Sequence, residues 1–339
     1  MTLDRRTFVA GSLALGASAM LPRAHAAGTV LKISHQFPGG TLTEGDFRDR
    51  LCRMFAAEVE RRTNGALKAQ VYPGSSLMKT TAQFSALRKG ALDMSLVPLS
   101  YGGGEVPEVN IGLMPGLVTS YEQGLGWKNK EIGRDLIGLL ADKGLVILSW
   151  VWQAGGVASR TRPVVEPEDA KGMKIRGGSR EVDMMLKAAG AAVVSLPSNE
   201  IYAAMQTGAV DAAMTSSTSL ISFRLEEVSK HLTTGRGKAY WYMFEPLVIS
   251  KSVFDALPKD MQAVAMAVGA ELEKFALEGA RADDQLLASV YQKAGAKVYD
   301  LTDATVKRWQ GVARDTAWKD FAERGERSAR LLKLAEQTL

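Results

Sequence analysis

The sequence is poor in the residues that build metal and thiol sites. It contains one cysteine, Cys52, and three histidines, His25, His35 and His231. A single cysteine can form no disulfide within the chain, and scattered histidines provide neither the ligand set of a zinc site nor a cysteine–histidine pair. We therefore expect no metal, no cofactor and no thiol chemistry. Cys52 lies on an apolar helical face and is interpreted as a small core residue.

Long apolar runs and a large charge excess are also missing. No apolar run is long enough to span a bilayer. The formal net charge of +5 is too small to indicate nucleic-acid binding. The N-terminal segment instead contains paired arginines, a short and weakly apolar run and an A-x-A cleavage site, in "RRTFVAGSLALGASAMLPRAHA". We interpret residues 1–26 as a twin-arginine-type export signal, with an ordinary secretory signal as the alternative. The mature chain of 313 residues then lies in a bacterial periplasm with a formal net charge of +3.

Strand-like and helix-like segments alternate along the mature chain. "TVLKIS", "LKAQVYP" and "LVILSWVW" are typical of strands, whereas Tyr121–Lys143 and residues 258–293 have helical patterns. This alternation predicts βαβ units and mostly parallel sheets. Because it restarts after a turn-rich break that begins at Gln153, we predict two α/β lobes. The strand-like segment "KAYWYMFEPLVIS" is expected to cross back to the first lobe.

The segment "KGMKIRGGS", residues 171–179, suggests an anion site. Arg176 ends a short apolar strand, two glycines follow, and Ser179 is placed to cap a helix. Ligands of open parallel sheets bind beyond the carboxyl ends of the strands, where a guanidinium can grip a carboxylate with two parallel N–H groups. The alternative is a surface arginine that pairs with Asp169 or Glu200.

Several segments in register resemble the solute-binding proteins of TRAP (tripartite ATP-independent periplasmic) transporters. "EPEDAKGMKIRGGS" resembles the family's "pedlkGlKiR" segment, and "GAAVVSLPSNEIYAAMQTGAVDAA" its "Ga.pvp…e.y.alq.G.vDg". "FAAEVERRTNGALKAQVYPGSSL" matches a third segment, so the likeness covers most of the mature chain. The resemblance implies a two-lobe periplasmic binding protein fold (type II-like), with mixed sheets, a hinged cleft and a long helix across both lobes. We expect residues 27–152 and about 240–280 in one lobe, and residues 153–239 and about 281–339 in the other.

The resemblance also implies a function. Family members enclose an organic acid, pair its carboxylate with the "KiR" arginine, here Arg176, and deliver it to a permease of small and large membrane subunits. Most members are monomers. Two departures bear on the ligand: Thr215 stands where many members have an asparagine, and the second arginine of sialic-acid-type members is missing near Gly155-Gly156. We therefore expect a single carboxylate on a small mono-acid with an aromatic or apolar body, such as an aromatic 2-oxo acid.

The predicted ligand-binding residues follow strand ends or flank the expected cleft. They are Arg176, Thr215, Trp152, Gln153, Tyr101, His35, Gln36, Trp241, Ser198 and Ser216. For each aromatic residue, packing in a core is an equally good interpretation. His35 is also explained as a hydrogen-bonded loop histidine.

Two other classes of protein compete with a transport role. A periplasmic enzyme acting on organic acids would need a base, for which Glu200 and Asp211 are the candidates, but both have simple structural roles. The serine-rich "TSSTS" has no nearby histidine to activate it, and "SYGGGEVPE" lacks the spacing of a phosphate-binding loop. A binding protein that serves an ABC importer or a sensor kinase would share the fold.

Overall fold

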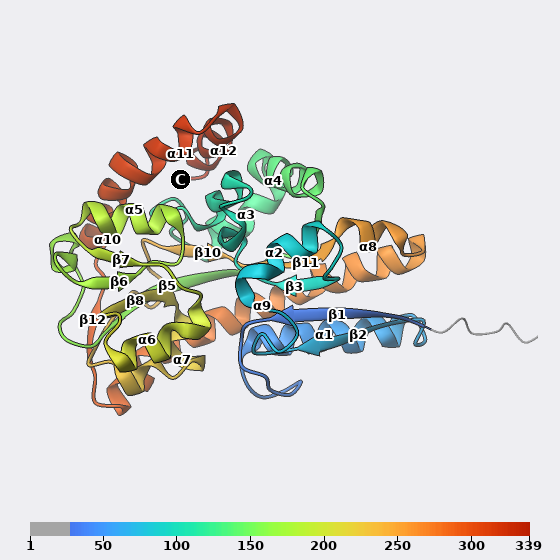
Figure 1. The fold of residues 1–339 in the computed structure, drawn as a ribbon, viewed down its shortest axis with the longest axis horizontal. Helices are drawn as coiled ribbons and strands as arrows, with labels where there is room; N and C mark the ends of the chain where they lie inside the picture. The colour runs from blue at the N-terminus through green and yellow to red at the C-terminus, as the bar shows by residue number, and fades with distance from the viewer. Residues whose placement is uncertain (1–27) are drawn as a thin grey trace, which may run out of the picture.

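A computed structural model describes residues 28–339 of the chain (Figure 1). The predicted export signal, residues 1–26, lies outside this part. Among residues 28–339, no helix combines the length and the apolar character that crossing a membrane requires. Two sheets with helices packed around them give the described chain two lobes, as predicted (Figure 1).

The first lobe is built on a five-stranded sheet with the order β2-β1-β3-β11-β4. β1 is parallel to β2 and β3, as expected of βαβ units, whereas β11 is antiparallel to both of its neighbours. Leu31 and Ile33 are buried and alternate with the exposed Val30 and Lys32, so the first part of β1 has one face on the core, whereas Ser34 and His35 at its end are both buried. The strands are β1 (Thr29–His35), β2 (Leu67–Tyr72), β3 (Met94–Leu96), β4 (Leu145–Ser149) and β11 (Leu247–Ser250).

The second lobe is built on a seven-stranded sheet with the order β12-β9-β5-β8-β6-β7, in which β10 also pairs with β5. β6 is parallel to β7 and β8, and β12 is parallel to β9. All antiparallel pairs of the described chain involve β5, β10 or β11, which adjoin the two crossings between the lobes. The strands are β5 (Trp152–Ser159), β6 (Lys174–Arg176), β7 (Ala192–Val194), β8 (Ala212–Ser216), β9 (His231–Thr234), β10 (Tyr242–Phe244) and β12 (Lys297–Asp300).

The helices cover the sheets and close the ends of the molecule (Figure 1). The α-helices are α1 (Phe47–Arg62), α2 (Thr80–Arg88), α3 (Tyr121–Gly126), α4 (Glu131–Asp142), α5 (Arg180–Ala188), α6 (Ile201–Thr207), α7 (Ser217–Ser222), α8 (Lys251–Ala256), α9 (Lys259–Lys293), α10 (Asp303–Ala313), α11 (Lys319–Glu323) and α12 (Glu326–Glu336). Two 3-10 helices, η1 (Leu99–Gly102) and η2 (Pro107–Leu113), and one π-helical segment, η7 (Arg314–Trp318), contribute to the site described below.

The long helix predicted for residues 258–293 is α9, and it spans both lobes. It packs on α1 and β4 of the first lobe and on α7, β9 and β12 of the second. Gly269 makes one of these contacts possible, because a Cβ at this position would lie 2.2 Å from the backbone oxygen of Leu148. A rigid element of 35 residues therefore connects the two sheets.

Two predicted boundaries are wrong. The break expected to begin at Gln153 is instead the central strand β5, because Gly155 and Gly156 admit close neighbours there. A Cβ on Gly155 would lie 1.7 Å from the Trp241 ring, and one on Gly156 2.7 Å from the oxygen of Thr233. The helix expected over Tyr121–Lys143 is divided into α3 and α4 by the 3-10 helix Trp127–Asn129 and the extended backbone of Lys130.

The predicted lobe boundaries differ from the packing at two points. β10 joins the second sheet, although its residues fall in the segment expected in the first lobe. α12 packs against α4 and η2 of the first lobe, although it falls in the segment expected in the second. The reason lies in its apolar stripe, which includes the fully buried Leu331 and Ala335. The C-terminal segment therefore contacts both lobes.

Candidate functional site

Arg176 occupies the position that the sequence predicts, at the carboxyl end of β6. Only 2% of the residue is exposed, so its guanidinium is held within the protein. Gly178, at φ +110°, makes room for it, because a Cβ there would lie 2.7 Å from Nη1 of Arg176. Ser179 caps α5 by accepting a hydrogen bond from the N–H of Val182, as the sequence suggests.

The guanidinium of Arg176 has unused donors. Nε donates to the oxygen of Leu196 at 3.0 Å, Nη1 to the oxygen of Met214 at 2.8 Å and Nη2 to the hydroxyl of Tyr101 at 3.2 Å. Since a guanidinium has five N–H groups, one remains on Nη1 and one on Nη2. None of the ion pairs among residues 28–339 includes Arg176, so neither Asp169 nor Glu200 serves as its counter-ion. A buried cation without a carboxylate partner, and with two donors to spare, favours the binding of an anion.

A small cavity lies beside the guanidinium, at the junction of the two lobes. Its volume of about 10 Å³ is room for one water molecule, so the lobes are closed around it. The hydroxyl of Tyr101, from the first lobe, accepts hydrogen bonds from Arg176 and from the N–H of Ser198, both in the second. The cavity is lined by Pro98, Tyr101, Leu113, Arg176, Gly178, Ser198, Thr215, Trp241 and Met243.

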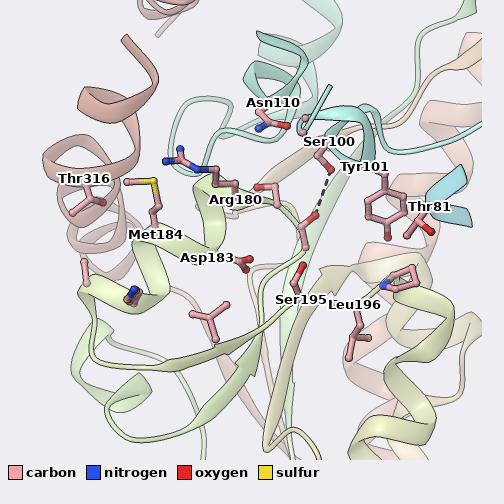
Figure 2. Close-up of a pocket in the computed structure, with 18 residues that line it drawn as sticks. Thr81, Ser100, Tyr101, Asn110, Arg180, Asp183, Met184, Ser195, Leu196 and Thr316 are labelled. Atoms are coloured by element: carbon pink, nitrogen blue, oxygen red, sulfur yellow. Dashed lines mark hydrogen bonds between the residues drawn. The ribbon is translucent and has the colours of Figure 1, made fainter. Parts of the chain in front are cut away.

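A larger groove opens next to this cavity and shares two of its walls, Tyr101 and Gly178. Its volume is about 1040 Å³, and both lobes line it. Figure 2 shows η1 and Asn110 on one side of the groove and α5 on the other, joined by the hydrogen bond from Ser100 Oγ to the oxygen of Gly178 at 3.3 Å. The groove is therefore the outer part of the cleft between the lobes.

Five of the ten predicted ligand-binding residues meet at the small cavity. They are Arg176, Thr215, Tyr101, Ser198 and Trp241. They come from β6, β8, η1, the segment before α6 and the segment before β10, respectively. The indole nitrogen of Trp241 is buried and has no hydrogen-bond partner within the described chain. These residues remain candidates for ligand contact, which the geometry allows.

The structure places the other five away from this cavity. The Trp152 ring packs in the core against Trp127 and Phe244, with ring centroids 5.2 and 5.0 Å away, and does not line the cavity. His35 is buried, with Nε2 3.1 Å from Asp49 and Nδ1 accepting from the N–H of Phe37, which matches the loop-histidine interpretation.

Gln36, Gln153 and Ser216 are buried polar residues. The amide of Gln36 has no hydrogen-bond partner within the described chain. Gln153 donates to Glu245, and Ser216 caps α7 by accepting from the N–H of Ser219. None of the three lines the small cavity, so their predicted ligand contacts are unsupported in this closed arrangement.

Arg48 and Glu245 form a buried polar network that the sequence does not reveal. Arg48, in the first turn of α1, is fully buried and contacts Asp46 at 2.6 Å and Glu245 at 3.3 Å. Its Nη1 also donates to Ser219 Oγ of the second lobe at 3.0 Å. The neighbouring acids, mainly Asp46, hold the pKa of Arg48 above its ordinary value although burial opposes this. The network joins the lobes at the base of the cleft.

The Glu245 carboxyl should give the protein a pH-dependent stability. Burial raises its pKa from 4.5 to about 7, although Arg48 and Gln153 oppose the shift. The folded protein therefore binds a proton more tightly than the unfolded chain. This stabilisation is complete below pH 4.5 and is lost as the pH rises through 7. We expect Glu245→Gln to reduce the drop in unfolding free energy between pH 5 and pH 8 by roughly 2–3 kcal/mol.

Urea unfolding at both pH values tests the role of Glu245. The control is Glu278→Gln, an exposed glutamate on α9, which should leave the pH dependence as in the wild type. An unchanged pH dependence in Glu245→Gln would show that folding does not raise the pKa of this carboxyl.

The fold and the cleft together define a class of protein. Two α/β lobes close over a buried arginine that lacks a counter-ion, and two chain crossings and one long helix connect the lobes. This is the architecture of a periplasmic solute-binding protein, which holds its ligand between lobes.

Comparison with known proteins identifies the family. Residues 39–324 match the model of the family described as bacterial extracellular solute-binding protein, family 7 (DctP), and the chain belongs to this family. It is 69% identical over 338 residues to a solute-binding protein of Albidiferax ferrireducens, covering 99% of this chain and all of the relative. A C4-dicarboxylate-binding periplasmic protein DctP of Rhodobacter capsulatus is 27% identical over 306 residues, 89% of each chain.

Solved structures agree with this assignment. A TRAP periplasmic solute binding protein from Rhodoferax ferrireducens, with bound malonate, has a TM-score of 0.90 and 72% identity, covering 91% of this chain and 98% of that one. DctP7 of Bordetella pertussis, a receptor binding pyroglutamic acid, has a TM-score of 0.81 at 22% identity and covers 91% of this chain and 100% of its own, which shows the shared fold. The chain is thus a TRAP-type periplasmic solute-binding protein and not an enzyme.

Proposed function

We propose that this protein captures one small organic acid between its lobes and delivers it to the small and large membrane subunits of a TRAP permease. The ligand carboxylate binds the two free N–H groups of Arg176. The observation that carries this proposal is the buried guanidinium that lacks an acidic partner among residues 28–339. We also propose that the protein reaches the periplasm by the twin-arginine route and acts as a monomer.

The walls of the cavity favour a mono-acid with an apolar or aromatic body, such as an aromatic 2-oxo acid. Trp241, Met243 and Leu113 supply apolar surface beside Arg176. Thr215 and Ser198 add hydroxyl groups that can hydrogen-bond a carboxylate or a keto oxygen. An aromatic body needs more room than the closed cavity gives, and the adjoining groove supplies it once the lobes part.

A short diacid is the second candidate. The Rhodoferax ferrireducens protein that is 72% identical to this chain was solved with malonate. The second carboxylate would then have to be received by hydroxyl groups, because among residues 28–339 only Arg176 brings a guanidinium to the cavity.

A thermal-shift screen followed by calorimetry tests the function and separates the two ligand types. The panel pairs phenylpyruvate and pyruvate with malonate and succinate. A ligand at one hundred times its dissociation constant should stabilise the folded protein by about 2.7 kcal/mol. Stabilisation by malonate and succinate alone would overturn the mono-acid assignment. No response to any acid, in a wider organic-acid library as well, would overturn capture through Arg176.

A further inference from the structure

Asp183 is an acid in the groove that has no partner. It lies in the first turn of α5, and Figure 2 shows its carboxyl pointing into the groove between Ser195 and Arg180. Oδ1 is buried and makes no hydrogen bond among residues 28–339. A buried carboxyl oxygen without a donor is costly, so its position calls for a group that the protein itself does not supply.

The cations around the groove do not fill this role. Arg180 is paired with Asp320 of α11, its Nη2 being 3.0 Å from Oδ1 of that residue. Lys187, one helical turn after Asp183, lines the groove but forms no ion pair with it. Burial raises the pKa of Asp183 to about 6. The positive charge of Arg176 opposes this shift, although the two side chains form no ion pair within residues 28–339. Asp183 therefore lies close to Arg176 but is not neutralised by it.

The side chains of Asp183 and Arg176 lie against two consecutive glycines. A Cβ on Gly177 would lie 2.0 Å from Oδ1 of Asp183, and a Cβ on Gly178 2.7 Å from Nη1 of Arg176. Consecutive Cα atoms are about 3.8 Å apart, so the two side chains lie against neighbouring positions of the backbone. Because Gly178 and Tyr101 line both the cavity and the groove, a ligand of a few carbon atoms held by Arg176 can extend from the cavity into the groove, which Asp183 lines.

We propose that Asp183 is a second ligand-binding group, which accepts a hydrogen bond from a hydroxyl or ammonium group on the ligand. The ligand class is then an organic acid with such a donor a few bonds from the carboxylate that Arg176 holds. This inference rests on the proposed function. It makes Asp183 a determinant of specificity, because an unsubstituted acid leaves Oδ1 without a partner.

Matched acids that differ only in the donor group test the role of Asp183. One set is propanoate, lactate and alanine, and the other is 3-phenylpropanoate, 3-phenyllactate and phenylalanine. Calorimetry gives the ratio of dissociation constants within each set for the wild type, Asp183→Ala and Asp183→Asn. In at least one set we expect the wild type to bind the hydroxy or amino acid about 10- to 100-fold more tightly than the parent acid, the range for a hydrogen bond to a charged group.

The variants should lose this preference without losing the binding of the parent acid. The ratio should fall to near one in Asp183→Ala and to an intermediate value in Asp183→Asn, which keeps an acceptor but no charge. The control is Asp315→Asn, an exposed aspartate of η7, which should keep the wild-type ratio.

The outcomes separate this inference from the proposed function. If the wild type binds parent acids as tightly as substituted ones, or if Asp183→Ala keeps the wild-type ratio, the role of Asp183 is overturned while capture through Arg176 stands. If no acid of either set, and none of a wider library, binds the wild type, both are overturned. The member of a set that shows the preference identifies the donor as a hydroxyl or an ammonium group.

Discussion

Arg176→Ala is expected to abolish ligand binding at concentrations that saturate the wild type. Truncating one partner of a buried, hydrogen-bonded charge pair costs roughly 2–5 kcal/mol, which weakens binding about 30- to 4000-fold. The loss should be near the upper end, since among residues 28–339 only Arg176 brings a cationic side chain to the lining of the cavity. Calorimetry with the best acid of the screen measures the effect.

Arg176→Lys separates the charge from the paired donors. A lysine keeps a positive charge but cannot offer two parallel N–H groups, so we expect binding between that of the wild type and Arg176→Ala. Arg327→Ala, which removes a surface arginine paired with Asp142 and lines neither the cavity nor the groove, is the control and should bind as the wild type. Wild-type affinity in a folded Arg176→Ala protein would show that the carboxylate binds elsewhere.

The position of Arg176 can be predicted from the sequence because the features that determine it are neighbours along the chain. A strand end, two glycines and a helix cap are consecutive in "KIRGGS", and together they fix where the guanidinium of Arg176 lies. Tyr101, Thr215 and Trp241 can also be predicted as candidates, because each follows or precedes a strand that the sequence pattern indicates. The alternation of side chains, however, does not tell which face of a strand meets the cleft, and Trp152 therefore lies in the core.

Other parts of the site depend on contacts between distant segments. Arg48 and Glu245 are 197 positions apart, and in the sequence both resemble ordinary charged residues. Asp183 has the pattern of an acid that favours a helix N-terminus. Only the placement of η1 and α5 on opposite sides of the groove shows that Asp183 faces it. The same limit explains β5, where glycines that suggest a turn instead admit the Trp241 ring from another segment.

Arg48→Ala is expected to destabilise the protein by about 3–5 kcal/mol, the range for removing one partner of a buried ion pair. Asp46 and Glu245 would lose their shared cation, and both are buried, so neither carboxylate could turn to solvent. The guanidinium also stacks over the Phe37 ring at 3.6 Å, a contact that would be lost as well. Urea unfolding at pH 7.5 measures the change in free energy.

Neutralising Glu245 as well should offset part of the cost of losing Arg48. Arg48→Met combined with Glu245→Gln leaves fewer unpaired charges, so we expect the double variant to be more stable than the sum of its single changes predicts. Arg61→Ala on the same helix removes an exposed arginine paired with Glu58 and should cost less than 1 kcal/mol. A change below 1 kcal/mol in Arg48→Ala as well would mean that the buried network does not stabilise the fold. Arg48 also donates to Ser219 of the second lobe, so the lost contacts include one between the lobes.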